Sequence, residues 1–295
     1  MLIAGIRQIL YLLIVKIRFM EKIIVPVDFS EYSEFALQTA AMLAKKYSGE
    51  ILALHMLELN DSLLSSDEDK DEKSVFYLKL AEKRFNEFLD KDYLKGVSVR
   101  PMIKNFKVFS EVAKLAEDRS VDMIVMGSHG ASGMNEFFVG TNTERVVRHS
   151  EVPVLVVKGP PLGESFDKVV FVTNFDDEAV EVYLRSQKLF NDWGTEVHFV
   201  YVNLPNADFR SSKEIDDKVT DFLLKADGNL DALSKVNYIS DYTIEDGVFE
   251  FAHKIDADLI AIPTHGRTGL SHFFSGSITE DIANHSILPV ITFKI

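Results

Sequence analysis

The sequence predicts an α/β protein with two tandem domains, each an open five-stranded parallel sheet with helices on both faces. Short apolar segments alternate with amphipathic segments along the 295 residues, which is typical of a parallel sheet covered by helices. The segment "MGSHGASGMNEFFVGTNTERVVRH" recurs in modified form as "IPTHGRTGLSHFFSGSITEDIANH", with its glycines 136 residues further on (266−130 and 276−140). This repeat indicates that the chain contains the same unit twice.

The first half begins with a strand at Lys22. Apolar runs predict strands, and apolar residues that recur every three or four positions predict helices. The segment 33–49, for example, places Phe35, Ala36 and Ala40 on one side of a helix and has Gly49 at its end. The expected strands are 22–27, 50–56, 97–103, 121–127 and 152–158, and the expected helices are 33–49, 74–94, 109–119 and 143–149.

The second half repeats this order of elements. A segment rich in proline and glycine, "GPPLGES", separates the two halves and is typical of a linker. The predicted division is an N-terminal extension (1–19), a first domain (20–158), a linker (159–166) and a second domain (167–295). The expected strands are 168–174, 195–202, 236–242, 257–263 and 288–295, and the expected helices are one from about 177 and those near 216–230, 247–255 and 279–285.

The first 19 residues are apolar and basic, but their longest uncharged run, 8–15, is too short to span a bilayer. No small-residue cleavage site follows, which disfavours a secretory signal. An amphipathic surface helix is one alternative. Because "MEKIIVPVDFS" starts a strand at once, we expect Met20 to be the true start and residues 1–19 to be an upstream extension.

Composition limits the classes of function. The net charge of −14 works against nucleic-acid binding, since affinity for phosphate backbones depends on clustered Lys and Arg. The absence of cysteine excludes disulfides, thiolate metal sites and cysteine nucleophiles, and it fits a reducing compartment. We therefore expect a cytoplasmic protein without a transmembrane segment.

Two special segments follow predicted strands. "VPVDFS" closes the first strand and the glycine segment closes the fourth, and ligands bind at the carboxyl ends of parallel strands where the strand order reverses. Gly127 and Gly130 would let the backbone approach a ligand without a Cβ in the way. Gly140 and Thr141 would start a helix, whose free N–H groups suit a phosphate.

A purely structural interpretation competes with this one. Thr141 and Glu144 fit a capping box, as do Ser277 and Glu280, and a capping box stabilises a helix start without any ligand. Capping does not explain why glycines recur at the same intervals in both halves. Ligand binding is therefore the favoured interpretation, and duplication without retained function is the alternative.

The glycine pattern resembles that of the ATP-binding subclass of the universal stress protein family. The pattern is Gly-x2-Gly-x9-Gly-[Ser/Thr], which Gly127, Gly130, Gly140 and Thr141 match in full, with Asp28 closing the first strand. The likeness covers nearly all of the chain as two tandem domains. It implies a Rossmann-like fold of the adenine nucleotide α-hydrolase type and ATP as the ligand, with or without Mg²⁺.

The resemblance also implies which residues would surround ATP in the first domain. Asp28 would lie near the ribose, Val27 and Met56 near adenine, and the two glycine-rich segments around the ribose and phosphates. The implied set is Pro26, Val27, Asp28, Met56, Met126, Gly127, His129, Gly130, Gly140, Thr141, Asn142 and Thr143.

The second domain departs from the family pattern at two positions. Pro263 replaces the first glycine and supplies no N–H group. Asn174 replaces Asp28 and carries no charge. A second, weaker site is therefore expected. Its implied residues are Thr173, Asn174, Val202, Pro263, His265, Gly266, Gly276, Ser277, Ile278 and Thr279.

Sequence signatures of common enzymes do not occur. There is no G-x-x-x-x-G-K-[ST] loop, G-x-S-x-G elbow or H-E-x-x-H helix. The segment 127–141 contains neither Lys nor Arg, whereas rapid phosphoryl transfer normally needs more positive charge. Asp67, Asp69 and Asp71 imitate the start of a calcium loop, but Glu72 stands where that loop needs glycine. We expect no catalytic residues and no metal site.

The leading hypothesis is a nucleotide-responsive stress regulator rather than a rapid enzyme. The alternatives are a scaffold that recruits partners without nucleotide and a slow ATPase or nucleotidyl-transferring enzyme. The last strands of the halves, 152–158 and 288–295, are apolar and would be exposed edges. The resemblance implies that single-domain relatives pair through this strand, so we expect the two domains to pair with each other, and a homodimer of the whole chain is a further option.

Overall fold

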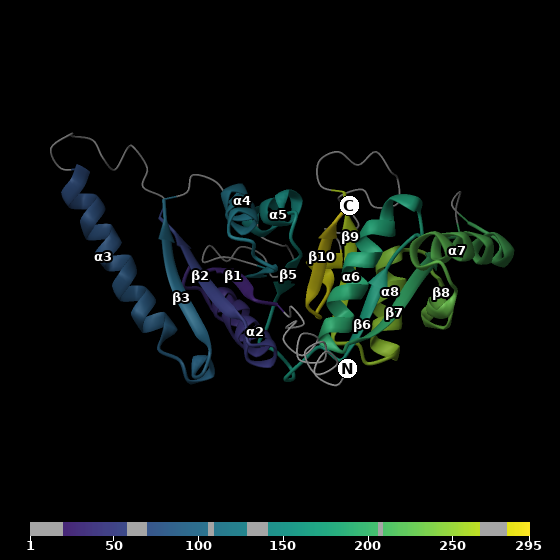
Figure 1. The fold of residues 1–295 in the computed structure, drawn as a ribbon, viewed down its shortest axis with the longest axis horizontal. Helices are drawn as coiled ribbons and strands as arrows, with labels where there is room; N and C mark the ends of the chain where they lie inside the picture. The colour runs from purple at the N-terminus through teal and green to yellow at the C-terminus, as the bar shows by residue number, and fades with distance from the viewer. Residues whose placement is uncertain (1–19, 58–69, 106–108, 129–140, 206–208, 266–281) are drawn as a thin grey trace, which may run out of the picture.

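The computed structural model describes residues 20–57, 70–105, 109–128, 141–205, 209–265 and 282–295, and these form an α/β fold (Figure 1). The strands of the first half are β1 (Lys22–Pro26), β2 (Glu50–Met56), β3 (Ser98–Lys104), β4 (Met123–Gly127) and β5 (Val154–Val157). Its helices are α2 (Glu31–Tyr47), α3 (Lys70–Leu89), the 3-10 helix η2 (Asp92–Leu94), α4 (Ser110–Asp118) and α5 (Thr141–His149).

The second half repeats this order. Its strands are β6 (Lys168–Val172), β7 (Glu196–Asn203), β8 (Val236–Ser240), β9 (Leu259–Thr264) and β10 (Val290–Lys294). Its helices are η3 (Asp177–Ala179), α6 (Val180–Trp193), α7 (Ser212–Asp227), η4 (Asp231–Lys235) and α8 (Ile244–Lys254), and residues 282–285 are also helical. The predicted fold class is confirmed.

Several helix boundaries differ from the predicted ones because caps decide them. The helix expected near 216 begins at Ser212, since Ser211 and Glu214 form a capping box. The helix expected at 247 begins at Ile244, since the Thr243 side chain accepts a hydrogen bond from the Asp246 N–H. The single helix expected over 74–94 is α3 followed by a separate 3-10 turn.

All ten strands of the described residues belong to one sheet, in the order β3-β2-β1-β4-β5-β10-β9-β6-β7-β8. Strands pair in parallel within each half, and β1 lies between β2 and β4 as expected. The halves meet where β5 and β10 pair antiparallel, with Leu155 opposite Ile291. The predicted pairing of the two domains through their last strands is confirmed. Figure 1 shows β3 and α3 at one end of the molecule and β8 and α7 at the other.

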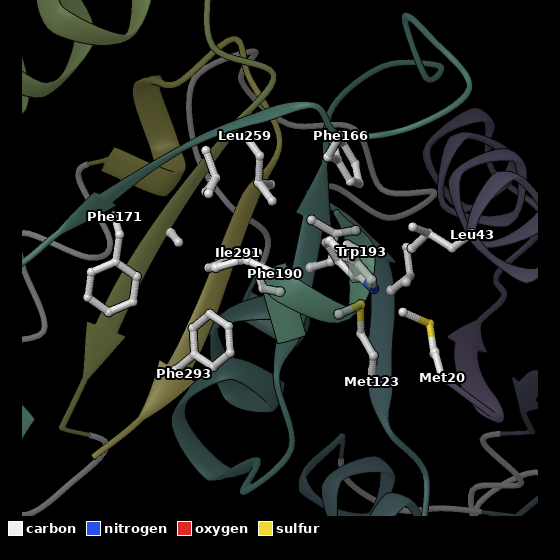
Figure 2. Packing of buried hydrophobic residues seen from close by; sticks show 14 of the residues in the cluster. Met20, Leu43, Met123, Phe166, Phe171, Phe190, Trp193, Leu259, Ile291 and Phe293 are labelled. Carbon is white, nitrogen blue, oxygen red and sulfur yellow. The ribbon is translucent and has the colours of Figure 1, made fainter. Parts of the chain in front are cut away.

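One hydrophobic core is continuous across both halves. It lies on the sheet face covered by α2, α3, α6 and α7 and includes Trp193, the only tryptophan of the chain. Figure 2 shows Trp193 among residues of both halves, including Met20, Met123 and Phe166. Two smaller clusters lie on the opposite face, one under α4 and α5 and one under α8, because successive strand residues point to opposite faces.

Tyr47 links the two halves within this core. Its hydroxyl donates a hydrogen bond to the carbonyl oxygen of Trp193 (3.0 Å), and the two rings stack at 6.1 Å. Burial, with a smaller effect of Asp167, raises the pKa of Tyr47 to about 12, so the hydroxyl keeps its proton at neutral pH. None of the described helices is long and apolar enough to cross a membrane.

We predict that Tyr47→Phe lowers the free energy of unfolding by about 1 kcal/mol, because one hydrogen bond between the halves is lost. Urea titration followed by the fluorescence of Trp193 measures this at the interface itself. The matched control is Tyr242→Phe, since that ring is 85% exposed. Equal stability of the parent and Tyr47→Phe would contradict the assigned role of this hydrogen bond.

Candidate functional site

The turn between β1 and α2 holds Asp28 in a fixed position. One oxygen of its carboxylate, Oδ1, accepts hydrogen bonds from the Ser30 N–H (3.0 Å) and the Ser30 hydroxyl (2.5 Å). Ser30 is also the N-cap of α2, where it accepts from the Ser33 N–H. The carboxylate is therefore tied to the first turn of a helix at the carboxyl end of the first strand.

The residue after Asp28 adopts a rare backbone conformation. Phe29 has φ +65°, a left-handed conformation that is unusual for a bulky side chain and costs about 1–3 kcal/mol. Its ring packs against Phe85 and Phe88, each at 5.5 Å, and against His55 at 4.5 Å. This aromatic packing offsets the backbone strain and fixes the direction in which the chain leaves the sheet.

The neighbouring strand brings the second predicted segment to the same edge. Since β1 pairs in parallel with both β2 and β4, the order reverses between β1 and β4, and their carboxyl ends form the place where such sheets bind ligands. Val27 and Asp28 directly follow the end of β1 there, and Met126 and Gly127 are the last two residues of β4. The described ends of the two predicted segments thus lie on neighbouring strands.

Gly127 is glycine for a reason that the sequence did not reveal. A Cβ at this position would lie 2.7 Å from both the Cβ and the carbonyl oxygen of Tyr32. Tyr32 belongs to the first turn of α2, so the missing side chain lets that helix pack closely on β4. The expectation that Gly127 keeps space for a ligand is therefore incomplete. The backbone of Tyr32 already occupies the place that a side chain on residue 127 would take.

The start of α5 differs from the predicted capping box. Thr141 is the first helical residue, and the Glu144 carboxylate bonds to Arg148 one turn further on. Thr143 is buried and donates from Oγ1 to the carbonyl oxygen of Gly127 (2.8 Å). This hydrogen bond attaches the helix start to the end of β4.

The other predicted residues differ in their exposure, and some lie outside the described residues. Val27 and Met126 are buried and Met56 is half-buried, whereas Thr141 and Asn142 are exposed at the first turn of α5. Pro26 ends β1. Outside the described residues lie His129, Gly130, Gly140, Gly266, Gly276, Ser277, Ile278 and Thr279.

Sequence reasoning missed two residues that contact the turn after β1. His55 binds the carbonyl oxygen of Val27 through Nδ1 (2.7 Å), and because a carbonyl can only accept, Nδ1 carries the proton. Burial lowers the pKa of His55. The hydrogen bond with the Val27 carbonyl and the charge of Asp28 raise this pKa, and the charge of Arg84 lowers it further, with a net decrease. Arg84, from α3, places its guanidinium carbon 4.9 Å from the centre of the Phe29 ring.

In the second half the same turn has different chemistry. Phe175 repeats the left-handed conformation with φ +54°, and its ring packs on Phe222 at 5.3 Å. Asn174 is buried, and its side-chain amide bonds to the carboxylate and N–H of Asp176. The Asp176 carboxylate also pairs with Lys218. The polar groups of this turn are thus bonded to one another.

The other predicted residues of the second half are also enclosed. Thr173 is buried and accepts a hydrogen bond from the Phe175 N–H (3.1 Å). Val202 and Pro263 are buried, and Nε2 of His265 lies 3.2 Å from a carboxylate oxygen of Glu178. The described part of this crevice is occupied by contacts within the chain.

Comparison with known proteins places the chain in a family. The model of the universal stress protein family matches it twice, over residues 20–158 and 165–294. The chain belongs to the universal stress protein family. The curated universal stress protein Slr1230 of Synechocystis is 22% identical, and the alignment covers 93% of this chain and all of that protein. A tandem arrangement thus occurs in both proteins.

Two further relatives are similar to this universal stress protein. Universal stress protein MJ0577 of Methanocaldococcus jannaschii is 31% identical over 153 residues, which are 47% of this chain and 94% of that protein. The crystal structure of a universal stress protein from Archaeoglobus fulgidus aligns with a TM-score of 0.65 and 25% identity, and it covers 94% of this chain and 97% of that chain. The structural likeness supports the two-domain fold.

We predict that Gly127→Ala destabilises this universal stress protein by about 1–3 kcal/mol, because the added Cβ collides with backbone atoms of α2. The matched control is Gly159→Ala, whose Cβ would meet no atom within 4 Å. Chemical denaturation of both variants measures the difference. Equal stability of the two variants would show that α2 moves aside at little cost.

A second prediction concerns pH. The lowered pKa of His55 means that the unfolded chain takes up a proton below about 6.5 before the folded chain does, so this histidine removes stability as pH falls from that value towards its folded pKa. His55→Asn keeps a donor near the Val27 carbonyl but does not titrate. The melting temperature of the variant should fall less between pH 7.5 and 5.5 than that of the parent. His253→Asn, at an exposed site, is the control, and equal pH dependence of all three proteins would contradict the prediction.

Proposed function

We propose that this protein binds ATP in the crevice of its first half and acts as a nucleotide-responsive stress regulator rather than as a rapid enzyme. The observation that carries the proposal is the position of Asp28. Its carboxylate is held by Ser30 at the carboxyl end of β1, directly beside β4. A carboxylate fixed at this switch point suits the hydroxyl groups of a ribose.

The residues present in the first half fit such a ligand. Thr141 and Asn142 are exposed at the first turn of α5, where helix N–H groups and the helix dipole favour a phosphate. Val27 and Met126 provide apolar walls. The resemblance of the glycine pattern to the ATP-binding subclass supports ATP as the ligand. ATP would supply the charged phosphate chain, and Mg²⁺ would reduce the repulsion within it.

The second half fits ATP less well. Asn174 carries no charge, and its amide already bonds to Asp176. Pro263 offers no N–H group where the first half has Gly127. We therefore propose one tightly bound nucleotide per chain, held by a domain that spans 20–158, with the second domain over 167–295 as its structural partner in the sheet.

We predict that Asp28→Asn weakens ATP binding about tenfold or more, since a hydrogen bond to a charged group is worth about 1.5–3 kcal/mol. Isothermal titration calorimetry gives affinity and stoichiometry together. Asn174→Asp is the matched control: it should leave the tight site unchanged and add no second one, because the new carboxylate would face Asp176.

Three outcomes would contradict this proposal. Two equal sites per chain would show that the departures in the second half do not matter. Unchanged affinity after Asp28→Asn would place the ribose elsewhere. Rapid release of phosphate, measured during prolonged incubation with ATP, would indicate an enzyme rather than a binding protein.

A further inference from the structure

The sheet has two outer edges, β3 at one end of the molecule and β8 at the other (Figure 1). Because β5 and β10 pair with each other, these two strands are the edges that the described residues leave for pairing with another chain. An edge strand presents a row of unpaired N–H and C=O groups that a further strand can bind. The two edges carry different residues, and this difference decides which of them favours pairing.

The edge at β3 carries features that oppose pairing with another chain. Its sequence, SVRPMIK, has Pro101 at its centre, which lacks an N–H group, and it includes the charged residues Arg100 and Lys104. Proline and positive charge are common means by which edge strands avoid other chains. β8, with the sequence VNYIS, contains neither. The sheet is therefore protected at β3 and unprotected at β8.

Exposed apolar side chains lie on β8 and on the segment that leads into it. Tyr238, at the centre of the strand, is 43% exposed, and Leu230 and Leu233 before the strand are 40% and 39% exposed. The Tyr238 hydroxyl forms a hydrogen bond with the carboxylate of Asp216 in α7, which holds the ring on the α7 face of the sheet. An aromatic ring held at an edge strand suits a cross-strand contact with another aromatic ring.

The charges beside β8 are complementary to those of a second copy of the same strand. Lys235 directly precedes the strand and Asp241 directly follows it, so each is three residues from Tyr238. An antiparallel pair of identical strands centred on Tyr238 therefore places Lys235 of each copy opposite Asp241 of the other. Within the described ranges neither Lys235 nor Asp241 forms an ion pair. Opposite charges across two strands stabilise their pairing.

These charges also select the register of the pair. A centre at Asn237 would place Lys235 opposite Ile239 and Asp241 opposite Leu233, both uncharged. A centre at Ile239 would likewise place the two charges opposite Thr243 and Asn237. Only the centre at Tyr238 brings the opposite charges together, and it also places the two Tyr238 rings directly opposite each other.

We propose that two copies of this chain pair through β8, antiparallel and centred on Tyr238, so that their sheets join into one. The pair has twofold symmetry, and each contact between Lys235 and Asp241 therefore occurs twice. The backbone groups at the outer side of β8 bind those of the second copy, and the exposed rings at the edge become covered. This interface is separate from the crevice of the first half and does not depend on a nucleotide.

Exchange of the two charges tests the proposal in the full-length chain. Sedimentation velocity over a range of concentrations should show a dimer of the parent and give its dissociation constant. Lys235→Asp or Asp241→Lys alone places like charges opposite each other twice and should weaken the dimer about tenfold or more. The double variant restores opposite charges and should return to within about threefold of the parent. Lys114→Asp, at an exposed position of α4 in the first half, is the matched control and should leave the dimer unchanged.

Cysteine cross-linking tests the register independently, because the chain contains no cysteine of its own. Tyr238→Cys would bring two thiols directly opposite each other across the symmetry axis, close enough for a disulfide. Ser240→Cys is the matched control on the same strand, since its two copies would stand four residues apart along the strand, about 13 Å. Mild oxidation should therefore cross-link the Tyr238→Cys variant into a covalent dimer and leave the Ser240→Cys variant without one.

Several results would overturn the proposal. A parent that stays monomeric at every concentration would show that β8 does not pair. A dimer that both single variants leave intact, or that the double variant fails to restore, would place the interface elsewhere. Cross-linking of Ser240→Cys in preference to Tyr238→Cys would show a different register. A single variant that fails to fold would not obscure the result, since the double variant and the cysteine variants test the same pairing.

Discussion

The antiparallel pairing of β5 with β10 is the interaction on which the rest of the molecule depends. Each strand would otherwise be an apolar edge, exposed to pairing with other chains. Joined through Leu155 and Ile291, they turn two five-stranded units into one sheet. The pairing also places α2 and α6 on the same face, so that a single core, with Trp193 inside it, crosses the boundary. Each half therefore supports the stability of the other.

The two halves have the same backbone conformation after their first strands but carry different side chains there. Phe29 and Phe175 both adopt the left-handed conformation after the first strand of their half, and aromatic neighbours hold both rings. The residue directly after each phenylalanine then decides the chemistry. Ser30 orients the carboxylate of Asp28, whereas Asp176 bonds to Asn174 and binds Lys218. The second half satisfies its polar groups by itself and needs no ligand to do so.

Most of the fold was predictable, because buried parallel strands are apolar on both faces and stand out in the sequence. Helix starts were less predictable, since a local cap such as Thr243 decides them. The site was predictable only in part. The positions of Asp28 and Gly127 followed from strand ends, but the contact of Gly127 with α2 did not. The contact of Arg84 with Phe29 did not follow either. Both contacts join residues that are far apart in the sequence, and local sequence patterns do not show which distant residues will meet.

The order of the strands places the first crevice close to the β5–β10 pair that joins the halves. β4, which ends at Gly127, is separated from β10 only by β5. Thr143 ties the start of α5 to Gly127, and α5 leads back into β5. A ligand that contacted the start of α5 would therefore contact the helix that precedes β5, the strand that pairs with β10. The second half differs at the matching turn, where the described side chains bond to one another, since Asn174 and Lys218 both bind the carboxylate of Asp176.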